Sequence, residues 1–220
     1  MCGRYAPNTT ATELINHFRL ISCPEFGVSF NIPPTSIIPV IRYKQDAGRV
    51  GQLVKWGLVP SWAKDSSGGA TLNNARGETV AEKPSFRTSF AKHRCLIPAS
   101  GFYEWQTIAG KKQPYYIHTS DPDAFFAFAG LLAAWKSPEG QTLVTTCIIT
   151  TTPNEVMEPI HDRMPVIIGT DQFDTWLDPQ NNNPDALLQL IRPCSPDGMT
   201  VHQVKPLRGD VPECIEPISV

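Results

Sequence analysis

The first third of the chain has a helical hydrophobic pattern followed by two apolar runs typical of strands. Residues 12–20 place apolar side chains at helical spacing, and the threonines before and within this segment can cap its first turn. Residues 37–43 and 51–56 are rich in β-branched and aromatic side chains, and a turn at residues 46–48 separates them. We therefore predict one short amphipathic helix and then a β-hairpin.

The rest of the chain alternates short strand patterns with single helices. A helix is predicted over residues 80–92, and a turn at Lys111 and Lys112. Strands are predicted at 101–105, 115–118, 125–135, 143–150 and after Met199, and helices at 171–177 and 184–191. Many short strands with helices inserted singly predict an α+β fold whose sheet is mostly antiparallel and strongly curved. No break in composition marks a boundary, so residues 1–220 are predicted to form one domain.

The predicted strand at residues 101–105 carries an acidic side chain among aromatic ones. A period of two places Phe102 and Glu104 on one face, and Tyr103 and Trp105 on the other. Such a carboxylate is either a charge on an exposed sheet edge or a desolvated acid with a raised pKa. For the second case we expect desolvation to outweigh the effect of any nearby arginine.

Composition restricts the class of protein. The chain has 220 residues, 41% of them hydrophobic and 18% charged, which is typical of a globular protein with a core. The start of the chain has no signal-peptide pattern, and the longest apolar run, residues 124–135, is too short to span a bilayer. Six scattered cysteines without a CxxC pair favour reduced thiols over disulfides or zinc. These features predict a cytoplasmic protein, or a nuclear one in a eukaryote, that does not bind a membrane.

Charge is distributed unevenly along the chain, although the formal net charge is only −2. Residues 1–110 hold 12 of the 19 basic residues but only 7 of the 21 acidic ones. This asymmetry either builds a local basic face, which could contact phosphates, or arises by chance on a solvated surface.

Cys2 has unusual chemistry if Met1 is removed. It would then carry an α-amine, with a pKa of about 7.7 against about 10.4 for lysine, next to a thiol. A 1,2-aminothiol can condense with an aldehyde to an imine and then close to a five-membered thiazolidine. The alternative is that this cysteine is second in the chain by chance.

Two further side chains have an ordinary and a functional interpretation. Trp62 lies in a segment broken by Gly57 and Pro60, so we predict a loop in which the ring is either a core anchor or a stacking group. His161 precedes Pro165, which indicates a loop at a sheet edge, where a lone histidine is more often structural than catalytic.

Six segments in order carry a resemblance to a known family, the SRAP (SOS response associated peptidase) family of abasic-site processing proteins. They are residues 1–5, 30–34, 56–62, 74–79, 98–105 and 161–165, and residues 212–217 look like the family's closing segment. The chain departs from the family pattern at Asn73, where a large apolar residue is usual, and at Gly77, where alanine is common.

The resemblance implies a barrel-like antiparallel core flanked by helices, a basic cleft, and covalent capture of abasic sites in single-stranded DNA during the DNA damage response. It implies that Cys2 is the nucleophile, that Glu104 moves protons, that His161 protonates or holds the sugar oxygen, and that Asn74 senses the missing base. It also implies a set of DNA contacts: Arg4, Asn31, Pro34, Trp62, Arg76, Arg87, Trp105, Thr150 and Arg163. No cofactor or metal is implied, peptidase activity would act on Met1, and we expect a monomer.

Three other functions remain open at this point. Class II glutamine amidotransferases also begin with Met-Cys-Gly, although their later motifs are missing from this chain. Cys2, Asn74 and His161 could form a thiol protease. A reversible lesion-binding module would recognise the same DNA but form no adduct.

Overall fold

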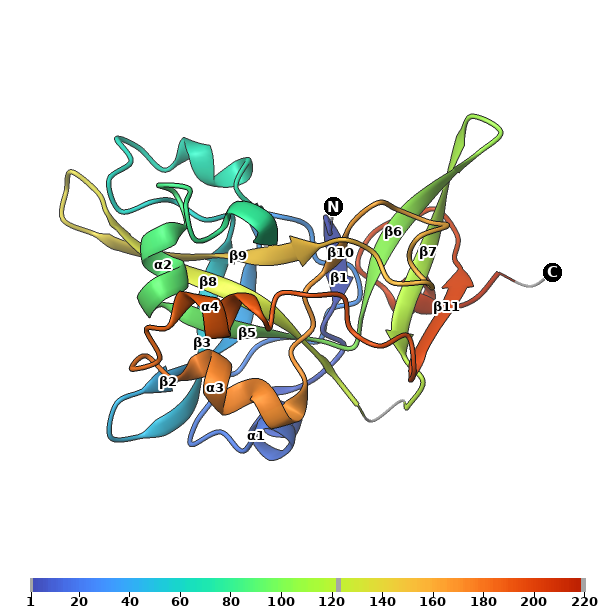
Figure 1. Cartoon of the computed structure of the whole chain (residues 1–220). Coiled ribbons are helices and arrows are strands. Elements are labelled where there is room, and N and C mark those ends of the chain that lie inside the picture. The colour runs from blue at the N-terminus through green and yellow to red at the C-terminus, as the bar shows by residue number, and fades with distance from the viewer. Residues whose placement is uncertain (1, 122–123, 219–220) are drawn as a thin grey trace.

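Within residues 2–121 and 124–218, the part of the chain that this computed structural model describes, five strands close into a barrel (Figure 1). They follow the order β9 (Thr142–Thr151), β3 (Gly48–Trp56), β2 (Ile37–Lys44), β5 (Arg94–Ala99) and β8 (Phe126–Lys136), and β8 returns to β9. The β3–β9 pair is parallel and the other four pairs are antiparallel. The prediction of a curved, mostly antiparallel, barrel-like sheet is therefore confirmed.

An open sheet of four strands packs beside the barrel. Its order is β1 (Arg4–Ala6), β6 (Gly101–Ile108), β7 (Lys111–Thr119) and β11 (Met199–Gln203), and all of its pairs are antiparallel. Only Ser100 separates β5 from β6, so the chain passes directly from the barrel into the open sheet. Two short strands, β4 (Asn74–Arg76) and β10 (Met164–Pro165), extend the barrel by pairing with β9.

Aromatic side chains join the two sheets. Tyr5 of β1 makes edge-to-face contacts with Trp56 of β3 and Phe128 of β8, and Phe102 of β6 makes another with Phe128. All four rings are buried. Because aromatic rings bury large apolar areas and such pairs prefer this geometry, the contacts fix the open sheet against the barrel.

The helices lie around the barrel, with α2 (Arg87–Lys92) at the end away from the open sheet and α1 (Ala11–Phe18) and α3 (Phe173–Leu177) below the barrel in the view of Figure 1. α1 is capped by Thr10, whose side chain accepts a hydrogen bond from the backbone nitrogen of Glu13. In return, the Glu13 carboxylate accepts a 2.7 Å hydrogen bond from the backbone nitrogen of Thr10. This reciprocal cap identifies Thr10 as the capping residue among the candidate threonines. The helix predicted at 171–177 appears as the 3-10 turn η3 (Thr170–Gln172) followed by α3 (Phe173–Leu177), and α4 (Pro184–Leu188) ends earlier than expected.

The helix predicted over residues 80–92 is wrong in its first half. Only α2 (Arg87–Lys92) is helical, and turns occupy residues 80–86 after the 3-10 segment η2 (Gly77–Thr79). Pro84 lies in this interval; it lacks an N–H group and disfavours helical geometry in the residue before it.

The remaining short elements are two 3-10 segments, η1 (Ser67–Ala70) and η4 (Pro212–Ile215). The turn expected at Lys111 and Lys112 lies two residues earlier, at Ala109 and Gly110, and the lysines begin β7. Among the described residues, no helix has the length and apolar character needed to cross a membrane.

Candidate active site

The two strands that lead to Cys2 and Glu104 are neighbours in the open sheet. In β1 and β6, Arg4 lies opposite Tyr103, and Tyr5 lies opposite Phe102. The alternation predicted for residues 101–105 is confirmed, since Phe102 packs in the same core cluster as Cys2 while Tyr103 packs in a separate one with Trp105 at its margin. The antiparallel pairing thus brings the start of the chain alongside the strand that bears Glu104.

Cys2 and Glu104 are both buried, and both groups favour their neutral forms. The Cys2 side chain is inaccessible to solvent, and burial, followed by the nearby charge of Glu104, raises the pKa of its thiol well above the ordinary value. Glu104 is only 2% exposed, and desolvation raises the pKa of its carboxyl group although His161 acts in the opposite direction. The interpretation of Glu104 as a desolvated acid is confirmed, and the exposed-edge alternative is wrong.

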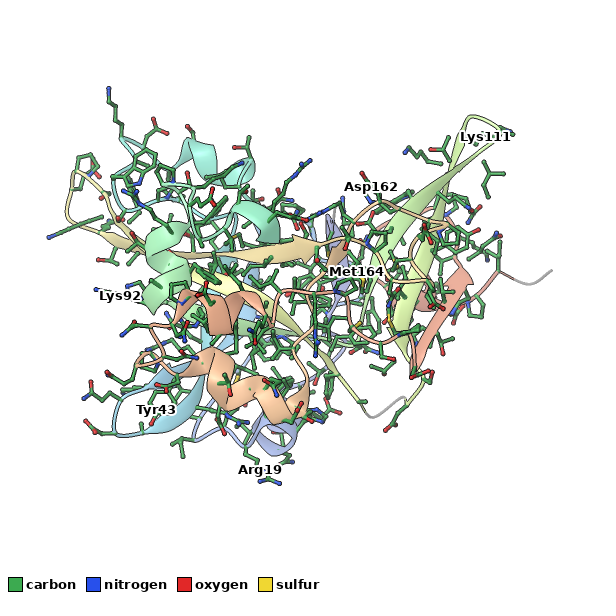
Figure 2. The ribbon with its side chains drawn as sticks, in the orientation of Figure 1. Arg19, Tyr43, Lys92, Lys111, Asp162 and Met164 are labelled. Atoms are coloured by element: carbon green, nitrogen blue, oxygen red, sulfur yellow. The ribbon has the colours of Figure 1, made fainter. Side chains whose placement is uncertain are left out.

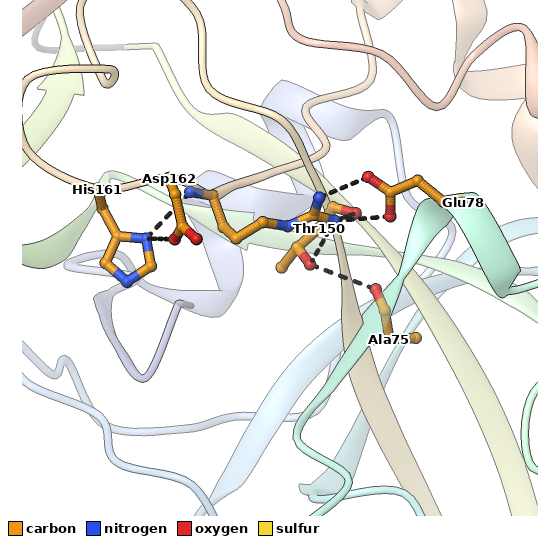
Figure 3. Close-up of polar contacts among 6 residues, drawn as sticks. Ala75, Glu78, Thr150, His161 and Asp162 are labelled. Carbon is orange, nitrogen blue, oxygen red and sulfur yellow. Dashed lines mark hydrogen bonds and ion pairs between the residues drawn. The ribbon is translucent and has the colours of Figure 1, made fainter.

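His161 points one ring nitrogen toward Glu104. Its Nε2 lies 3.8 Å from Glu104 Oε2, while its Nδ1 lies 3.0 Å from the backbone nitrogen of Arg163 and 2.8 Å from Asp162 Oδ1 (Figure 3). A neutral imidazole cannot both accept the Arg163 N–H bond and donate to Asp162 through the same nitrogen. The backbone N–H can only donate, and Asp162 is mostly exposed, so we assign the proton to Nε2, which faces Glu104.

Asn74 ties the barrel to the start of the chain. It begins β4, which runs parallel to β9 with Asn74 beside Ile148. Its Nδ2 donates a 2.9 Å hydrogen bond to the carbonyl oxygen of Cys2. Its Oδ1 is buried and has no hydrogen-bond partner among the described residues, so it can accept a bond from a donor brought by a substrate.

Arg163 is held by a carboxylate that the sequence reasoning missed. Its guanidinium makes a two-pronged pair with Glu78, in which NH2 donates at 2.9 Å to Oε2, and the same nitrogen donates at 2.7 Å to the carbonyl of Thr150 (Figure 3). The hydrogen bond from Arg163 is the main cause that lowers the pKa of Glu78. Arg163 and Thr150, both expected to contact DNA, thus contact each other in the interior and secure β10 against β9.

Gly77 accounts for one departure from the family pattern. A side-chain carbon added there would lie 2.2 Å from Ile191 and 3.2 Å from the carbonyl of Thr150. Glycine therefore lets the segment after α4 approach the backbone that carries Arg76 and Thr150.

The other residues predicted to contact DNA differ in exposure and in their distance from the cluster. Arg4 donates to Asn31 at 3.3 Å, Pro34 is partly exposed, and Trp105 is partly buried. Trp62 is 65% exposed on its loop, so it is not a core anchor, while a stacking role stays a prediction.

The two remaining arginines lie at different distances from the cluster. Arg76 is exposed at the end of β4, two residues after Asn74. Arg87 is exposed on α2, which lies on the far side of the barrel from β1, so the structure does not bring it to the cluster (Figure 1).

The cluster lies between the barrel and the open sheet. Asp162 and Met164, which flank Arg163, occupy this central region, whereas Lys111 marks the distant tip of the β6–β7 hairpin (Figure 2). Among the residues described, no group of three or more histidine, cysteine or acidic side chains could hold a metal ion. Met1 lies outside the described residues, so its removal stays a prediction.

Comparison with known proteins identifies the class to which this fold and site belong. The family model described as SOS response associated peptidase (SRAP) matches residues 1–211, and the chain belongs to this family. A crystal structure of a protein from Bacteroides thetaiotaomicron shares the fold, with a TM-score of 0.88, 24% identity, and coverage of 99% of this chain and 100% of that one.

Two relatives are both named abasic site processing proteins. Abasic site processing protein YoqW of Bacillus subtilis (strain 168) is 42% identical over 224 residues, which cover 98% of this chain and 99% of that protein. Abasic site processing protein HMCES of Rattus norvegicus is 32% identical over 239 residues, which cover 90% of this chain and 66% of that protein.

Proposed function

We propose that this protein processes abasic sites in single-stranded DNA by capturing them covalently through Cys2 after Met1 is removed. Relatives that match along nearly the whole chain are named abasic site processing proteins. The observation that carries the proposal is the convergence of Asn74, Glu104 and His161 on the start of the chain, where the α-amine and the thiol of Cys2 would both be present.

The first step opens the sugar. An abasic deoxyribose equilibrates between a closed hemiacetal and an open aldehyde, and only the aldehyde reacts with an amine. Ring opening removes a proton from the hydroxyl at C1′ and delivers one to the ring oxygen. Glu104, in its carboxylate form, takes the first proton, and His161 supplies the second from Nε2, the nitrogen that faces Glu104. The proton held by Glu104 then passes to Nε2, so both groups return to their starting forms. Because its pKa is raised, Glu104 exchanges protons near neutral pH more readily than an exposed glutamate.

The second step forms two bonds to the same carbon. The α-amine of Cys2 adds to C1′, and loss of one water gives an imine. The thiol sulfur then adds to the imine carbon, and the thiol proton passes to the nitrogen, which closes the thiazolidine. The thiol is protonated in the buried site, so Glu104 takes the thiol proton and passes it on to the nitrogen.

Closure of the ring protects the DNA strand. An imine on an abasic sugar withdraws electrons and promotes β-elimination, which breaks the strand. Addition of sulfur removes the C=N bond that acts as the electron sink, so the captured strand stays intact. We propose that Asn74 supports this geometry by holding the Cys2 carbonyl through Nδ2 and accepting a hydrogen bond from the sugar through Oδ1.

The DNA path proposed here runs past the cluster rather than across the whole molecule. Arg4, two residues after Cys2, and Arg76, two residues after Asn74, would contact phosphates. Exposed Trp62 would stack on a base for about 1–3 kcal/mol without regard to sequence. A lesion sensor needs such tolerance, because abasic sites arise in any sequence. The peptidase activity in the family description is proposed here as removal of Met1, which frees the α-amine.

Intact-protein mass spectrometry tests the proposal. The purified protein is measured alone and after exposure to a synthetic single strand with one abasic site, with a strand of the same sequence but an intact base as control. We expect a chain lacking Met1 and a covalent adduct whose mass equals protein plus abasic strand minus one water. A chain that lacks Met1 but gives no adduct would overturn covalent capture. Release of ammonia from glutamine would instead favour the amidotransferase alternative.

A further inference from the structure

The last part of the chain folds back from the open sheet as a closed loop, here called the C-terminal loop (residues 204–218). Val204 and Pro217 form a bridge, and the backbone nitrogen of Ile218 donates to Gln203 at 3.0 Å. His202 of β11 holds the carbonyl of Ile215 at 2.9 Å. These contacts close the two ends of the loop, so its tip at residues 208–210 is presented at a defined place.

The tip grips the loop that follows residue 28. The carboxylate of Asp210 accepts hydrogen bonds from Ser29 Oγ at 2.5 Å, from the backbone nitrogen of Phe30 at 2.5 Å and from that of Asn31 at 2.8 Å. Ionised carboxylates make hydrogen bonds stronger than those between neutral groups. Three such bonds on one carboxylate fix residues 29–31 to the C-terminal loop across about 180 positions of sequence.

The same tip sets the direction of the Asn31 amide. Asn31 is 5% exposed, and its Nδ2 donates at 2.6 Å to the carbonyl oxygen of Gly209. Its Oδ1 then faces Arg4 and accepts a 3.3 Å bond from NH1. An amide has donors on one side and an acceptor on the other, so the Gly209 carbonyl decides which end Arg4 meets.

We propose that Asp210, together with the Gly209 carbonyl, is a positioning residue that holds Arg4 toward the DNA strand through Asn31. Asp210 itself does not touch the reacting atoms. This inference rests on the proposed function, in which Arg4, two residues after the nucleophile, contacts the phosphate or sugar next to the abasic site. It assigns the C-terminal loop to the binding surface although the loop is distant from Cys2 in the sequence.

The sign of one mutation separates this role from simple surface charge. DNA is anionic, so removing a carboxylate that merely repels phosphates tightens binding. Removing a carboxylate that positions Arg4 weakens binding, because the guanidinium loses its defined place. The exposed Glu213 lies on the same loop and, among the described residues, makes no hydrogen bond to residues 29–31, so Glu213→Gln is a matched control for charge alone.

The first arm of the test measures binding to an abasic single strand that is reduced with borohydride, which cannot form the adduct. Fluorescence anisotropy is recorded for wild type, Asp210→Ala, Asp210→Asn, Arg4→Ala, the Asp210→Ala/Arg4→Ala double variant and Glu213→Gln. We expect Asp210→Ala to weaken affinity about fivefold, with Asp210→Asn intermediate. In the double variant, Asp210→Ala has no further effect, because the two residues act as one unit. Glu213→Gln binds as well as wild type or slightly better.

The second arm uses the free protein and does not depend on DNA. Nuclear magnetic resonance follows the side-chain amide protons of Asn31 in wild type and in Asp210→Asn, which keeps the shape of the residue if Asp210→Ala is unstable. We expect the wild-type amide to be protected from exchange and the variant to lose that protection, while thermal unfolding of the variant stays cooperative. Retained protection in Asp210→Asn and Asp210→Ala overturns the positioning role.

The two arms distinguish failure of this inference from failure of the proposed function. Suppose that the wild type binds the strand and Arg4→Ala weakens this binding, but Asp210→Ala tightens it, as expected when a repelling charge is removed. The inference is then wrong and the proposed function stands. If wild type does not bind the abasic strand, yet Asp210→Asn releases the Asn31 amide, the contact of Asp210 with Asn31 stands and the proposed function is wrong.

Discussion

The barrel and the open sheet make different contributions to the site between them. The open sheet supplies Cys2 and Glu104, from the neighbouring strands β1 and β6, and burial raises the pKa of both groups. The barrel supplies Asn74 from β4 and His161 from the segment before β10, both attached to β9. Its buried Arg163 is paired with Glu78.

The two sheets also differ in how their strands are held. Every strand of the barrel is hydrogen-bonded on both sides within the described structure, so residues attached to β9 are held in place. The open sheet instead ends at β1, the strand that follows Cys2, and only the isolated bridge between Tyr5 and Ile32 continues it within the described residues. We infer that the open sheet carries the bond-forming chemistry and the barrel holds the groups that orient it. The following predictions test this division, beginning with the largest effect.

Cys2→Ala removes the reactive group of the open sheet and leaves the barrel unchanged. We expect the heat-stable adduct to fall by at least about 100-fold, because the thiol that closes the ring is lost. Denaturing gels after incubation with an abasic strand measure this yield. Borohydride trapping should still capture an imine through the new α-amine, and strand cleavage should rise. A heat-stable adduct of undiminished yield would remove Cys2 from the mechanism.

Glu104→Gln tests the proton transfer assigned to the open sheet. The variant keeps the shape of the side chain but cannot titrate, so crosslinking should slow by about tenfold or more near neutral pH while DNA binding is retained. Single-turnover crosslinking between pH 5 and 9 measures this difference. If rate and pH profile match the wild type, proton transfer belongs to His161 alone.

The pH dependence of the stability of Glu104→Gln provides an independent check on the raised pKa of Glu104. The folded protein holds the Glu104 proton more tightly than the unfolded chain does, since the folded pKa is raised. The wild type therefore loses stability as pH rises from about 4.3 toward the folded pKa, and Glu104→Gln loses less over this window. Urea unfolding at pH 4 and pH 8 should show a smaller difference for the variant.

Glu78→Gln tests the charge pair on the barrel side. The substitution leaves buried Arg163 without its carboxylate partner. We expect the free energy of unfolding to fall by about 2 kcal/mol at pH 7, less than for a fully buried ion pair because the Glu78 side chain is half exposed. The pKa of Glu78 is lowered, so the stabilisation is present above about pH 4.3 and is lost as pH falls below it. The exposed Glu82→Gln is the control. Equal unfolding curves for both variants would contradict the structural role of the pair.

Arg76→Ala has the smallest expected effect, since it removes one exposed charge beside the barrel side of the site. Affinity should weaken about twofold to threefold for every sequence, and the slope of log K against log salt should become shallower by about 0.7. Anisotropy at several salt concentrations measures the slope. Lys111→Ala, at the distant hairpin tip (Figure 2), should leave it unchanged. An unchanged slope for Arg76→Ala would place Arg76 away from the DNA.

Local patterns in the sequence determined the secondary structure and part of the chemistry. Alternation in residues 101–105 predicts which faces Phe102 and Tyr103 occupy, and the threonines before α1 predict its start, because both signals depend on neighbouring residues. The position of Cys2 after Met1 predicts aminothiol chemistry if Met1 is removed, and this stays a prediction. Where two local signals compete, as at Pro84 within an apparent helix, the sequence alone predicted the wrong element.

Only the tertiary structure decided which side chains meet and which are charged. The sequence left Glu104 as either an edge charge or a desolvated acid, and the folded protein leaves it only 2% exposed, because desolvation depends on elements distant in the sequence. Glu78 meets Arg163 across 85 positions, and Asp210 meets Asn31 across 179. No local periodicity encodes such pairs, since they arise when the closed barrel, the open sheet and the C-terminal loop pack together.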